Sequence, residues 1–220
     1  MSEAKSRISC AGKTGRPSRK RSLELTERIL DVATAMFLEI GYEASSIDAI
    51  ASIAGISKRT FYARFPSKAE LFEAVVVRYI NEKLSEYDRE VQPSDDLRQG
   101  LTETATSLLK RALVPETIAL DRVITGEAKK FPELARVLYD HGLLRAADRV
   151  RTVLEAGAAR GEISRTHIDY LATAFLHCVF APVLRLATLG LEPPAFTTKS
   201  SKQVADAVDL FLNGALVTRE

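Results

Sequence analysis

The chain has 220 residues, of which 46% are hydrophobic and 27% are charged, values that are ordinary for a globular protein and exclude disorder throughout. Its two cysteines indicate neither a disulfide framework nor a cysteine metal site and fit a reducing compartment. The net charge of +2 is uneven, because residues 1–68 hold 12 basic and 7 acidic side chains whereas residues 69–220 hold 19 and 22, which predicts a polyanion contact at one end of the molecule.

Residues 1–22 hold few large apolar side chains and many Ser, Gly and basic residues, including the sequence GRPSRKR at 15–21. This composition predicts a flexible basic arm. The arm either contacts a polyanion or is only a solvated charged tail. The N-terminus has no apolar signal core, so we do not expect secretion.

The first predicted helix begins near Leu25 and ends at Gly41. Its apolar residues recur at helical spacing, and glycine is a common left-handed cap residue at a helix C-terminus. The residues of this stripe are Ile29, Val32, Ala33, Met36, Phe37 and Ile40.

Two short helices are predicted next, at 46–54 and 57–65. Ser45 with Asp48 is a weak capping box for the first, and Ser57 is the expected N-cap of the second. Gly55 permits the tight turn between them, and Pro66 ends the second helix. Small residues allow the helices to cross closely, and five apolar side chains are expected to face inward: Ile47, Ile50, Ile56, Phe61 and Phe65.

A long helix follows, opened by the capping box of Ser67 and Glu70. Its expected buried stripe is Leu71, Phe72, Val75, Val76, Tyr79, Ile80, Leu84 and Tyr87. After Pro93 the periodic segments are again helical, at 95–113, 116–130, 133–160, 167–190 and 200–217. Alternating strand patterns and hairpin signals are lacking, so the predicted fold class is all-α.

The segment 171–191 is apolar and long enough to span a bilayer, but it contains His177, Pro182 and Arg185. A charged residue near the centre of a span is costly, so a buried bundle helix is the preferred interpretation and no membrane partner is expected. Pro182 is expected to kink this helix.

The two short helices form a predicted helix-turn-helix, whose second helix can lie in the major groove of DNA. Lys and Arg can reach guanine acceptors, and hydroxyl groups can bind phosphate oxygens. A solvated charged face with no ligand is the alternative. The outward donors and their neighbours, together with the residues that begin the flanking helices, are the candidate DNA contacts: Ser46, Lys58, Arg59, Thr60, Tyr62, Ala63, Arg64 and Lys68.

About fifty residues here, through GYEASSIDAIASIAGISKRTFYARFPSKAELFEAV, resemble the AcrR-type N-terminal domain of the TetR family of bacterial transcriptional regulators. The resemblance implies that Thr60 and Tyr62 touch the DNA backbone or bases and that Lys68 binds phosphate. It also implies that Lys58 and Arg59 vary with operator sequence. Many relatives carry a small residue where this chain has Arg59, a side chain that can read guanine.

The arm offers a second contact. Gly15-Arg16-Pro17 resembles the core of hooks in which an extended Arg enters a narrow A·T-rich minor groove. The alternative is non-specific phosphate attraction by the basic residues of the arm. These are Arg16, Arg19, Lys20 and Arg21.

The TetR-family regulators that this chain resembles are homodimers. The last two predicted helices, near 167–190 and 200–217, are the expected pairing surface. Near-heptad apolar residues allow a four-helix bundle, although an intramolecular core explains each of them equally well. They are Leu171, Ala172, Phe175, Leu176, Val179, Val183 and Leu186 in one helix, and Val204, Val208, Phe211, Ala215 and Leu216 in the other.

The stretches FPELARVLYDHGLLRAADRV at 131–150 and ARGEI at 159–163 resemble an AefR-like C-terminal domain. That resemblance implies a small-molecule effector in a pocket between helices, which changes the separation of the two reading helices. Candidate pocket residues place polar groups among apolar neighbours, although each is otherwise a core or surface residue. They are Arg122, Tyr139, His141, His177 and Cys178.

Three histidines without metal spacing argue against zinc, and catalytic triads, phosphate loops and dinucleotide motifs are lacking, so neither cofactor nor enzymatic activity is expected. The predicted domains are the arm (1–22), the helix-turn-helix domain (23–68), a connecting helix (69–92) and a ligand-binding and dimerisation domain (93–220). The expected protein is a cytoplasmic homodimeric repressor released from a palindromic operator by a small ligand. Alternatives are an activator, a ligand-independent architectural DNA-binding protein, or an enzyme or scaffold whose helix-turn-helix only packs.

Overall fold

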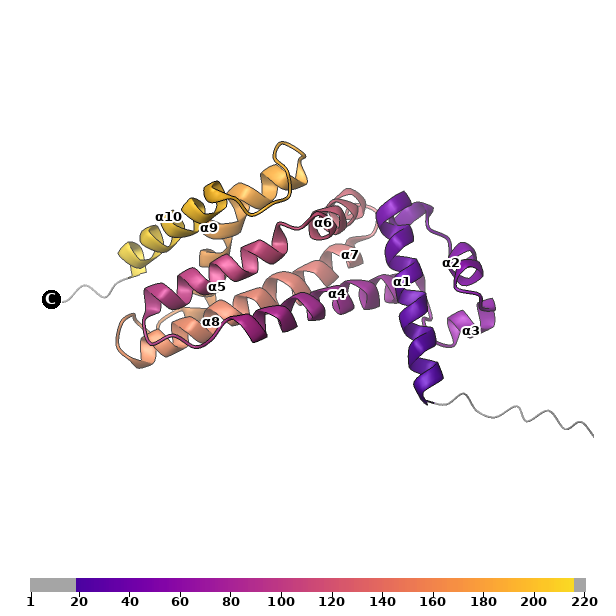
Figure 1. Cartoon of the computed structure of the whole chain (residues 1–220), viewed down its shortest axis with the longest axis horizontal. Coiled ribbons are helices and arrows are strands. Elements are labelled where there is room, and N and C mark those ends of the chain that lie inside the picture. The colour runs from indigo at the N-terminus through magenta and orange to yellow at the C-terminus, as the bar shows by residue number, and fades with distance from the viewer. Residues whose placement is uncertain (1–18, 216–220) are drawn as a thin grey trace, which may run out of the picture.

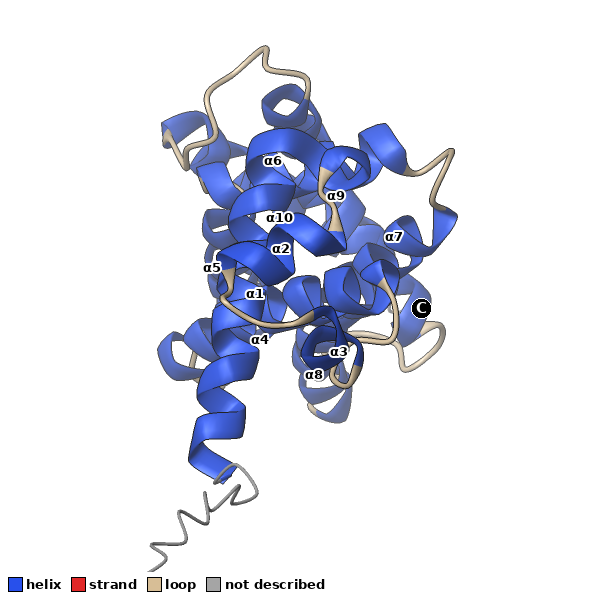
Figure 2. Ribbon diagram, turned by 90° about the vertical axis from the view of Figure 1, so that its right-hand side faces the viewer, coloured by secondary structure: helices blue, strands red, loops and turns tan. Residues whose placement is uncertain are grey.

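The structure is a computed structural model that describes residues 19–215, and these residues form helices joined by short connections (Figures 1 and 2). The all-α prediction is confirmed. The elements are α1 (Arg19–Ala44), α2 (Ile47–Ile53), α3 (Lys58–Tyr62), α4 (Lys68–Glu90), α5 (Leu97–Ala112), α6 (Pro115–Glu127), α7 (Pro132–Val137), the π-helical turn η1 (Leu138–Leu143), α8 (Leu144–Ala159), α9 (Ile168–Thr188) and α10 (Thr198–Ala215).

Figure 1 shows α1, α2 and α3 at one end of an elongated body, and α4 leading from that end along the rest of the bundle. The described residues form two apolar cores. One joins α1–α4 to residues of α6 and α7, among them Leu120, Ile124 and Leu134. The other is built mainly from α4, α5, α8, α9 and α10. Because α4 and α6 serve both the terminal module and the body, the helix-turn-helix is firmly attached to the bundle.

The N-caps follow the sequence signals with one exception. Ser57 accepts a hydrogen bond from the Thr60 amide, and Ser67 accepts one from the Glu70 amide, each at 3.1 Å. The expectation that Ser45 caps α2 is wrong, because Ser46 is the N-cap and accepts from the Ala49 amide at 3.1 Å. Ser45 is instead buried and donates to the Gly41 carbonyl at 2.7 Å.

Gly41 breaks the first helix differently from the expected left-handed cap. It has φ 84° and ψ 169°, a region that is open almost only to glycine, and the chain makes one more irregular turn before α2. Tyr42 is placed in the core by this turn, where its ring packs on Phe72 and Phe131. Gly55, with φ 66°, supplies the predicted turn between α2 and α3.

The expected continuous helix at 133–160 is three elements: α7, η1 and α8. The π-helical turn accommodates one extra residue, and such turns often occur at functional sites. Gly142 lies in it, and a β-carbon there would stand 3.3 Å from Leu138 Cδ1 and 3.7 Å from Ile80 Cδ1. The turn therefore brings its backbone close to α4.

α9 is long and apolar enough to cross a membrane, and it runs through Pro182. It packs against α5, α6, α8 and α10, as the core helix of a bundle does. At the positions whose side chains the structure describes, the near-heptad stripe expected at the dimer surface faces this intramolecular core instead, since Phe175, Val179 and Val204 are at most 1% exposed. Leu216 lies outside the described residues. The apolar period marks the buried face correctly but not the partner that covers it.

Candidate nucleic-acid interface and internal cavity

Buried apolar side chains hold the two helices of the helix-turn-helix together. Ile50 and Phe61 are fully buried, and Phe65 is 7% exposed. Ile47 and Ile56 are half-buried and pack against the same core. All five side chains expected to face inward therefore do so, and this fixes which side of α3 meets solvent.

The outward face of α3 carries most of the predicted DNA contacts. Lys58, Arg59, Tyr62 and Ala63 are exposed, with Tyr62 at 49%. Thr60 is half-buried, and its hydroxyl lies 2.9 Å from that of Ser57. Exposed donors at the start of a short helix suit contacts to base edges and phosphates.

Lys58 is not an isolated cation. Its ammonium forms a 2.8 Å ion pair with Asp48 of α2, and this hydrogen bond raises the pKa of Lys58. Both side chains are 63% exposed, so water screens the pair and it adds little stability. The pair does hold Lys58 against α2 and places a negative charge beside the outward face of α3.

Arg64 turns back toward the protein. Its guanidinium donates to the Thr60 carbonyl at 3.4 Å and to the Ser22 hydroxyl at 3.5 Å. Nε of Arg64 is buried and lacks a hydrogen-bond partner among residues 19–215. Arg64 thus joins the start of α1 to the end of α3.

Lys68 begins α4 and is anchored at the end of the first helix. Its ammonium donates to the carbonyls of Glu43 at 3.1 Å and Ser45 at 2.9 Å, and it lies 4.4 Å from the centre of the Tyr42 ring. Desolvation lowers the pKa of Lys68. Two of its three donors therefore serve the fold, which leaves one for a further acceptor.

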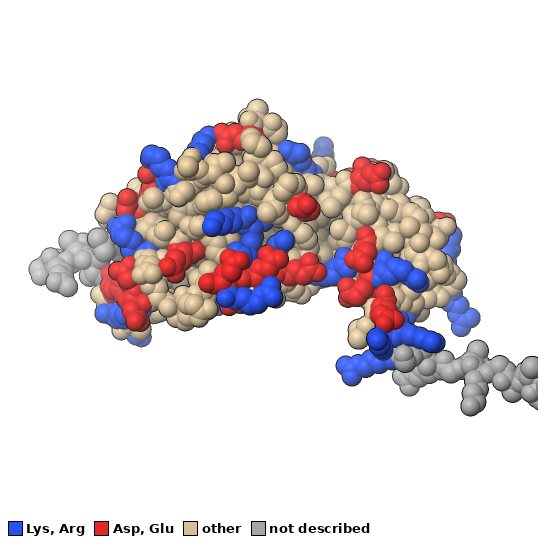
Figure 3. Space-filling view, in the orientation of Figure 1, with Lys and Arg blue, Asp and Glu red and all other residues tan. Residues whose placement is uncertain are grey.

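Ser46 is exposed at the N-terminus of α2, where its hydroxyl is used as the cap. Arg19 is exposed at the start of α1, and Figure 3 shows basic side chains gathered there. Arg16, the predicted minor-groove residue, lies outside the described residues.

A cavity of about 440 Å³ lies within the bundle between α4, α5, α6, α7, η1, α8 and α9. This volume is within the usual range of small-molecule sites. Most of its wall is apolar. The lining residues are Tyr79, Ile80, Lys83, Leu84, Leu108, Arg111, Ala112, Thr117, Leu120, Asp121, Ile124, Thr125, Ala128, Ala135, Leu138, Tyr139, Gly142, Leu143, Ala146, Leu176, Phe180 and Leu184.

Of the five predicted ligand residues, Tyr139 lines this cavity and the other four lie outside it. Arg122 donates to the Thr188 carbonyl at 2.8 Å and the Ala187 carbonyl at 2.7 Å, at the end of α9. His141 Nε2 is 3.6 Å from a Glu73 carboxylate oxygen. His177 and Cys178 are exposed on α9.

Six polar residues of the cavity wall are not ligand candidates by sequence: Tyr79, Lys83, Arg111, Thr117, Asp121 and Thr125. Burial in the bundle raises the pKa of Tyr79. The helical period places Tyr79 only in the core stripe. Lys83 and Arg111 resemble ordinary surface residues in the sequence, and no local pattern marks them.

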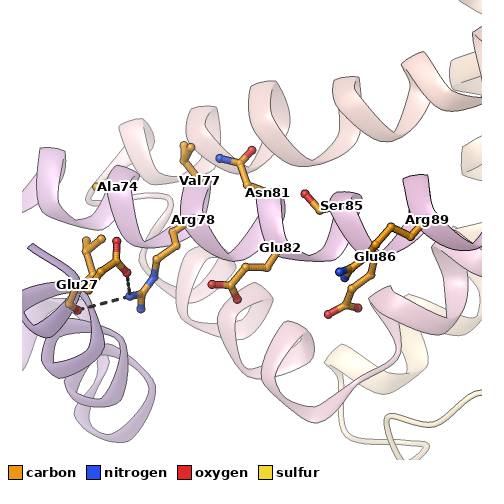
Figure 4. A pocket seen from close by; sticks show the side chains of 10 residues that line it. Glu27, Ala74, Val77, Arg78, Asn81, Glu82, Ser85, Glu86 and Arg89 are labelled. Carbon is orange, nitrogen blue, oxygen red and sulfur yellow. Dashed lines mark hydrogen bonds and ion pairs between the residues drawn. The ribbon is translucent and has the colours of Figure 1, made fainter. Parts of the chain in front are cut away.

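An open groove of about 670 Å³ follows the outer side of α4 (Figure 4). At its α1 end, Arg78 forms ion pairs with Glu27 at 3.0 Å and Asp31 at 2.8 Å, and it donates to Thr34 at 3.3 Å. Figure 4 shows the Arg78 guanidinium directed toward α1, with Glu82, Glu86 and Arg89 further along α4. Arg78 thus fastens α1 to α4.

A second connection reaches the turn before α2 from α6. A carboxylate oxygen of Glu127 accepts a hydrogen bond from the Glu43 amide at 3.1 Å, and Lys130 pairs with the Glu43 carboxylate. Glu127 ends α6, whose residues Leu120 and Ile124 line the cavity. One helix therefore touches both the cavity and the helix-turn-helix module.

Within residues 19–215, no group of three or more His, Cys, Asp or Glu side chains lies close enough together to hold a metal ion.

Two family profiles match the chain. The profile of the bacterial regulatory proteins of the tetR family matches residues 29–75. The profile of the C-terminal domain of AefR-like transcriptional repressors matches residues 99–214, which is more than half of the chain. Together they cover the helix-turn-helix and most of the cavity wall.

The chain is also similar to individual regulators. A TetR-family transcriptional regulator from Mesorhizobium loti superposes with a TM-score of 0.75 over 90% of this chain and 99% of that chain, and its 24% identity shows likeness of fold. The flavonoid-responsive regulator FrrA is 29% identical, with a TM-score of 0.72 over 89% of this chain and 99% of that chain.

Among curated relatives, the HTH-type transcriptional activator FasR of Mycolicibacterium smegmatis is 35% identical over 91 residues, 41% of this chain and 42% of that protein. The chain spans about half the length of the first curated relatives that it matches.

Proposed function

This chain belongs to the TetR family of bacterial transcriptional regulators, which are regulators rather than enzymes, and from that premise we propose a homodimeric repressor that a small molecule releases from a palindromic operator. In this proposal α3 reads the major groove through Lys58 and Arg59. Thr60, Tyr62 and Lys68 hold the DNA backbone. The single remaining donor of Lys68 is sufficient for one phosphate oxygen.

One observation carries the proposal: α4 begins beside the reading helix and then forms part of the cavity wall. Lys68 is in its first turn, and Tyr79, Ile80 and Lys83 follow in the cavity. Suppose that α4 has two positions and that DNA prefers one of them. A ligand that binds more tightly to the other position must then lower DNA affinity, by at most the ratio of its own affinities for the two positions. The cavity is thus well placed to control α3.

The dimer surface in this proposal is the solvent face of α9 and α10. Tyr170 and Leu210 are 72% and 69% exposed, and His177, Cys178 and Arg185 lie exposed on α9. A two-fold axis through this face would form a four-helix bundle. Such a dimer places two α3 helices for the two halves of a palindrome.

Repression is favoured over activation because the matching C-terminal profile describes repressors, whereas the relative FasR is named an activator. The name of FrrA states that it responds to flavonoids, which supports small-molecule control in a protein of similar structure. A cytoplasmic location follows from DNA as the partner.

The test of ligand control uses compounds that raise the melting temperature of the protein, since a ligand of the folded state stabilises it by mass action. A fluorescent operator fragment is titrated with wild-type protein and with Ala146→Phe, whose ring occupies part of the cavity. We expect such compounds to release DNA from the wild-type protein and not from the variant. Equal release from both would exclude the cavity as the effector site, and no release from either would favour the architectural alternative.

Sedimentation analysis tests the dimer. We expect two chains per particle, and we expect Leu210→Glu to yield monomers with unchanged helix content, because a charge in an apolar interface is costly. A dimer that survives this change would contradict the proposed surface.

A further inference from the structure

The chemistry of the cavity wall narrows the class of ligand, an inference that rests on the proposed ligand control. We propose that the cavity takes an apolar molecule that carries one anionic oxygen group, such as a carboxylate, sulfonate or phenolate. The anionic group lies at Arg111 and Lys83, and the apolar body lies among the Leu, Ile and Phe side chains.

Arg111 is the central observation. Its side chain is only 10% exposed, although arginine is seldom buried, and it lines the cavity. Nη2 pairs with Glu90 at 2.9 Å, and Nη1 donates to the Ser107 carbonyl at 2.9 Å. Nε has no hydrogen-bond partner in the described part of the chain, and the Glu86 carboxylate is 3.8 Å away. A buried N–H of a cation without an acceptor is unfavourable, so Arg111 retains capacity for an acceptor atom.

The charges around Arg111 are arranged with cations on the cavity side. Lys83 also lines the cavity, and its ammonium lies 3.5 Å from Glu86. Glu86 borders the open groove of Figure 4 instead, and the side chains of Glu86 and Glu90 are 40% and 65% exposed. Water therefore screens the carboxylates more than it screens Arg111.

The hydroxyl protons of Tyr79 and Thr117, near Arg111, are already donated within the protein. Thr117 donates to the Arg111 carbonyl at 2.9 Å, so the 2.7 Å contact between Tyr79 and Thr117 uses the Tyr79 proton. Besides the hydroxyl of Tyr139, the hydrogen-bond donors left for a ligand are then those of Lys83 and Arg111. An anionic oxygen satisfies them, whereas a ligand cation would meet two like charges.

Two further features agree with this assignment. α6 begins at Pro115 without a side-chain cap, and its third residue, Thr117, lines the cavity. The positive end of the α6 dipole is thus on the same side as the two cations. Asp121, the acidic residue of the wall, accepts a hydrogen bond from Thr188 at 2.7 Å, so one of its two carboxylate oxygens is engaged at the end of α9.

The test compares two fluorescent probes that share one ring system. 1-Anilinonaphthalene-8-sulfonate carries an anionic sulfonate, and N-phenyl-1-naphthylamine lacks it. Both are titrated into the full-length protein without DNA. We expect one sulfonate probe per chain, bound about fivefold or more tighter than the neutral probe, because the oxygen–guanidinium contact is charge-assisted.

Variants test whether Arg111 causes the preference for the sulfonate probe. Arg111→Met should weaken the sulfonate probe about fivefold or more and leave the neutral probe nearly unchanged. Arg151→Met removes a cation outside the cavity wall and should change neither. Ala146→Phe should weaken both probes. If circular dichroism shows that Arg111→Met is unfolded, Lys83→Met carries the same comparison.

Neutral-probe binding as tight as sulfonate binding would overturn the assignment. Equal weakening of both probes by Arg111→Met, or sulfonate binding that survives Ala146→Phe, would do the same. These titrations contain no DNA, so their outcome is separate from that of operator release. A selective probe that leaves the operator complex intact would support the ligand class and contradict the proposed ligand control.

Discussion

The carboxylate of Glu127, the last residue of α6, accepts a hydrogen bond at 3.1 Å from the backbone amide of Glu43, in the part of α1 that follows the kink at Gly41. α6 also forms part of the cavity wall through Leu120 and Ile124. In the proposed ligand control, a shift of α6 around a ligand would pull on the last turn of α1, in parallel with the connection through α4.

Glu127→Ala removes this link. We expect a loss of about 1 kcal/mol in the free energy of unfolding, because one hydrogen bond to a half-exposed carboxylate is lost. In the ligand-release assay, the variant should show a smaller difference between free and ligand-saturated DNA affinity. Glu133→Ala, an exposed acid at the start of α7, is the control. Unchanged coupling in Glu127→Ala would assign control to α4 alone.

Asp48→Asn frees Lys58 from its ion pair and removes a negative charge from the reading side. We expect DNA affinity on random sequences to rise about three- to tenfold at low salt, since non-specific binding is electrostatic. The stability of the protein should change by less than about 0.5 kcal/mol, because the pair is exposed. Fluorescence anisotropy at two salt concentrations measures the first effect, and lower affinity would contradict it.

Neighbouring aromatic residues separate folding from recognition. Phe61→Ala empties a fully buried site and should cost about 3–5 kcal/mol, with DNA binding lost through unfolding of the module. Tyr62→Ala alters an exposed ring and should leave stability within about 0.5 kcal/mol while weakening binding to all DNA sequences. Denaturant unfolding and DNA titration of both variants test this. A strongly destabilised Tyr62→Ala would show that Tyr62 is structural.

Two glycines should respond oppositely to alanine. Gly126 lies within α6, where an added β-carbon would meet open space, so Gly126→Ala should stabilise the protein by about 0.5–1 kcal/mol. Gly55 has equally open surroundings but φ 66°, so Gly55→Ala should destabilise it by about 1 kcal/mol through backbone strain alone. Thermal unfolding compares the two, and changes of the same sign would contradict the geometry of the turn.

Alkaline pH should weaken the fold through three tyrosines. Burial raises the pKa of Tyr42, Tyr79 and Tyr87 above the usual value of 10.0. The folded state thus holds these protons more tightly than the unfolded state, and the resulting stability is present below pH 10 and lost as pH rises through the folded values. Part of the tyrosinate absorbance should appear together with loss of helical circular dichroism. Full ionisation of a still-folded protein would contradict this.

Local signals predict the helix-turn-helix well. Ser57, Ser67 and Gly55 each act through atoms within a few residues, so the sequence alone places the two caps and the turn. The adjacent serines 45 and 46 have the same chemistry, and the irregular turn after Gly41 decides which of them caps α2.

Long-range features are not predictable in this way. The stripe of α9 predicts burial, but whether a neighbouring helix or a second chain covers it depends on tertiary packing. Likewise, the cavity arises where several helices do not fill the space between them, and the spacing of apolar residues along one helix does not predict such a void. Arg111 becomes a candidate only when its burial, and the lack of a hydrogen bond to its Nε among the described residues, are known.

Selection of genomic fragments on the purified protein, followed by titration of the best fragment at several salt concentrations, tests whether α3 reads an operator. We predict a palindromic site that is bound far more tightly than random DNA, with a steep salt dependence and with Arg59→Ala altering base preference at one position in each half-site. Weak binding without sequence preference, equally reduced on all DNA by Arg59→Ala, would contradict this account.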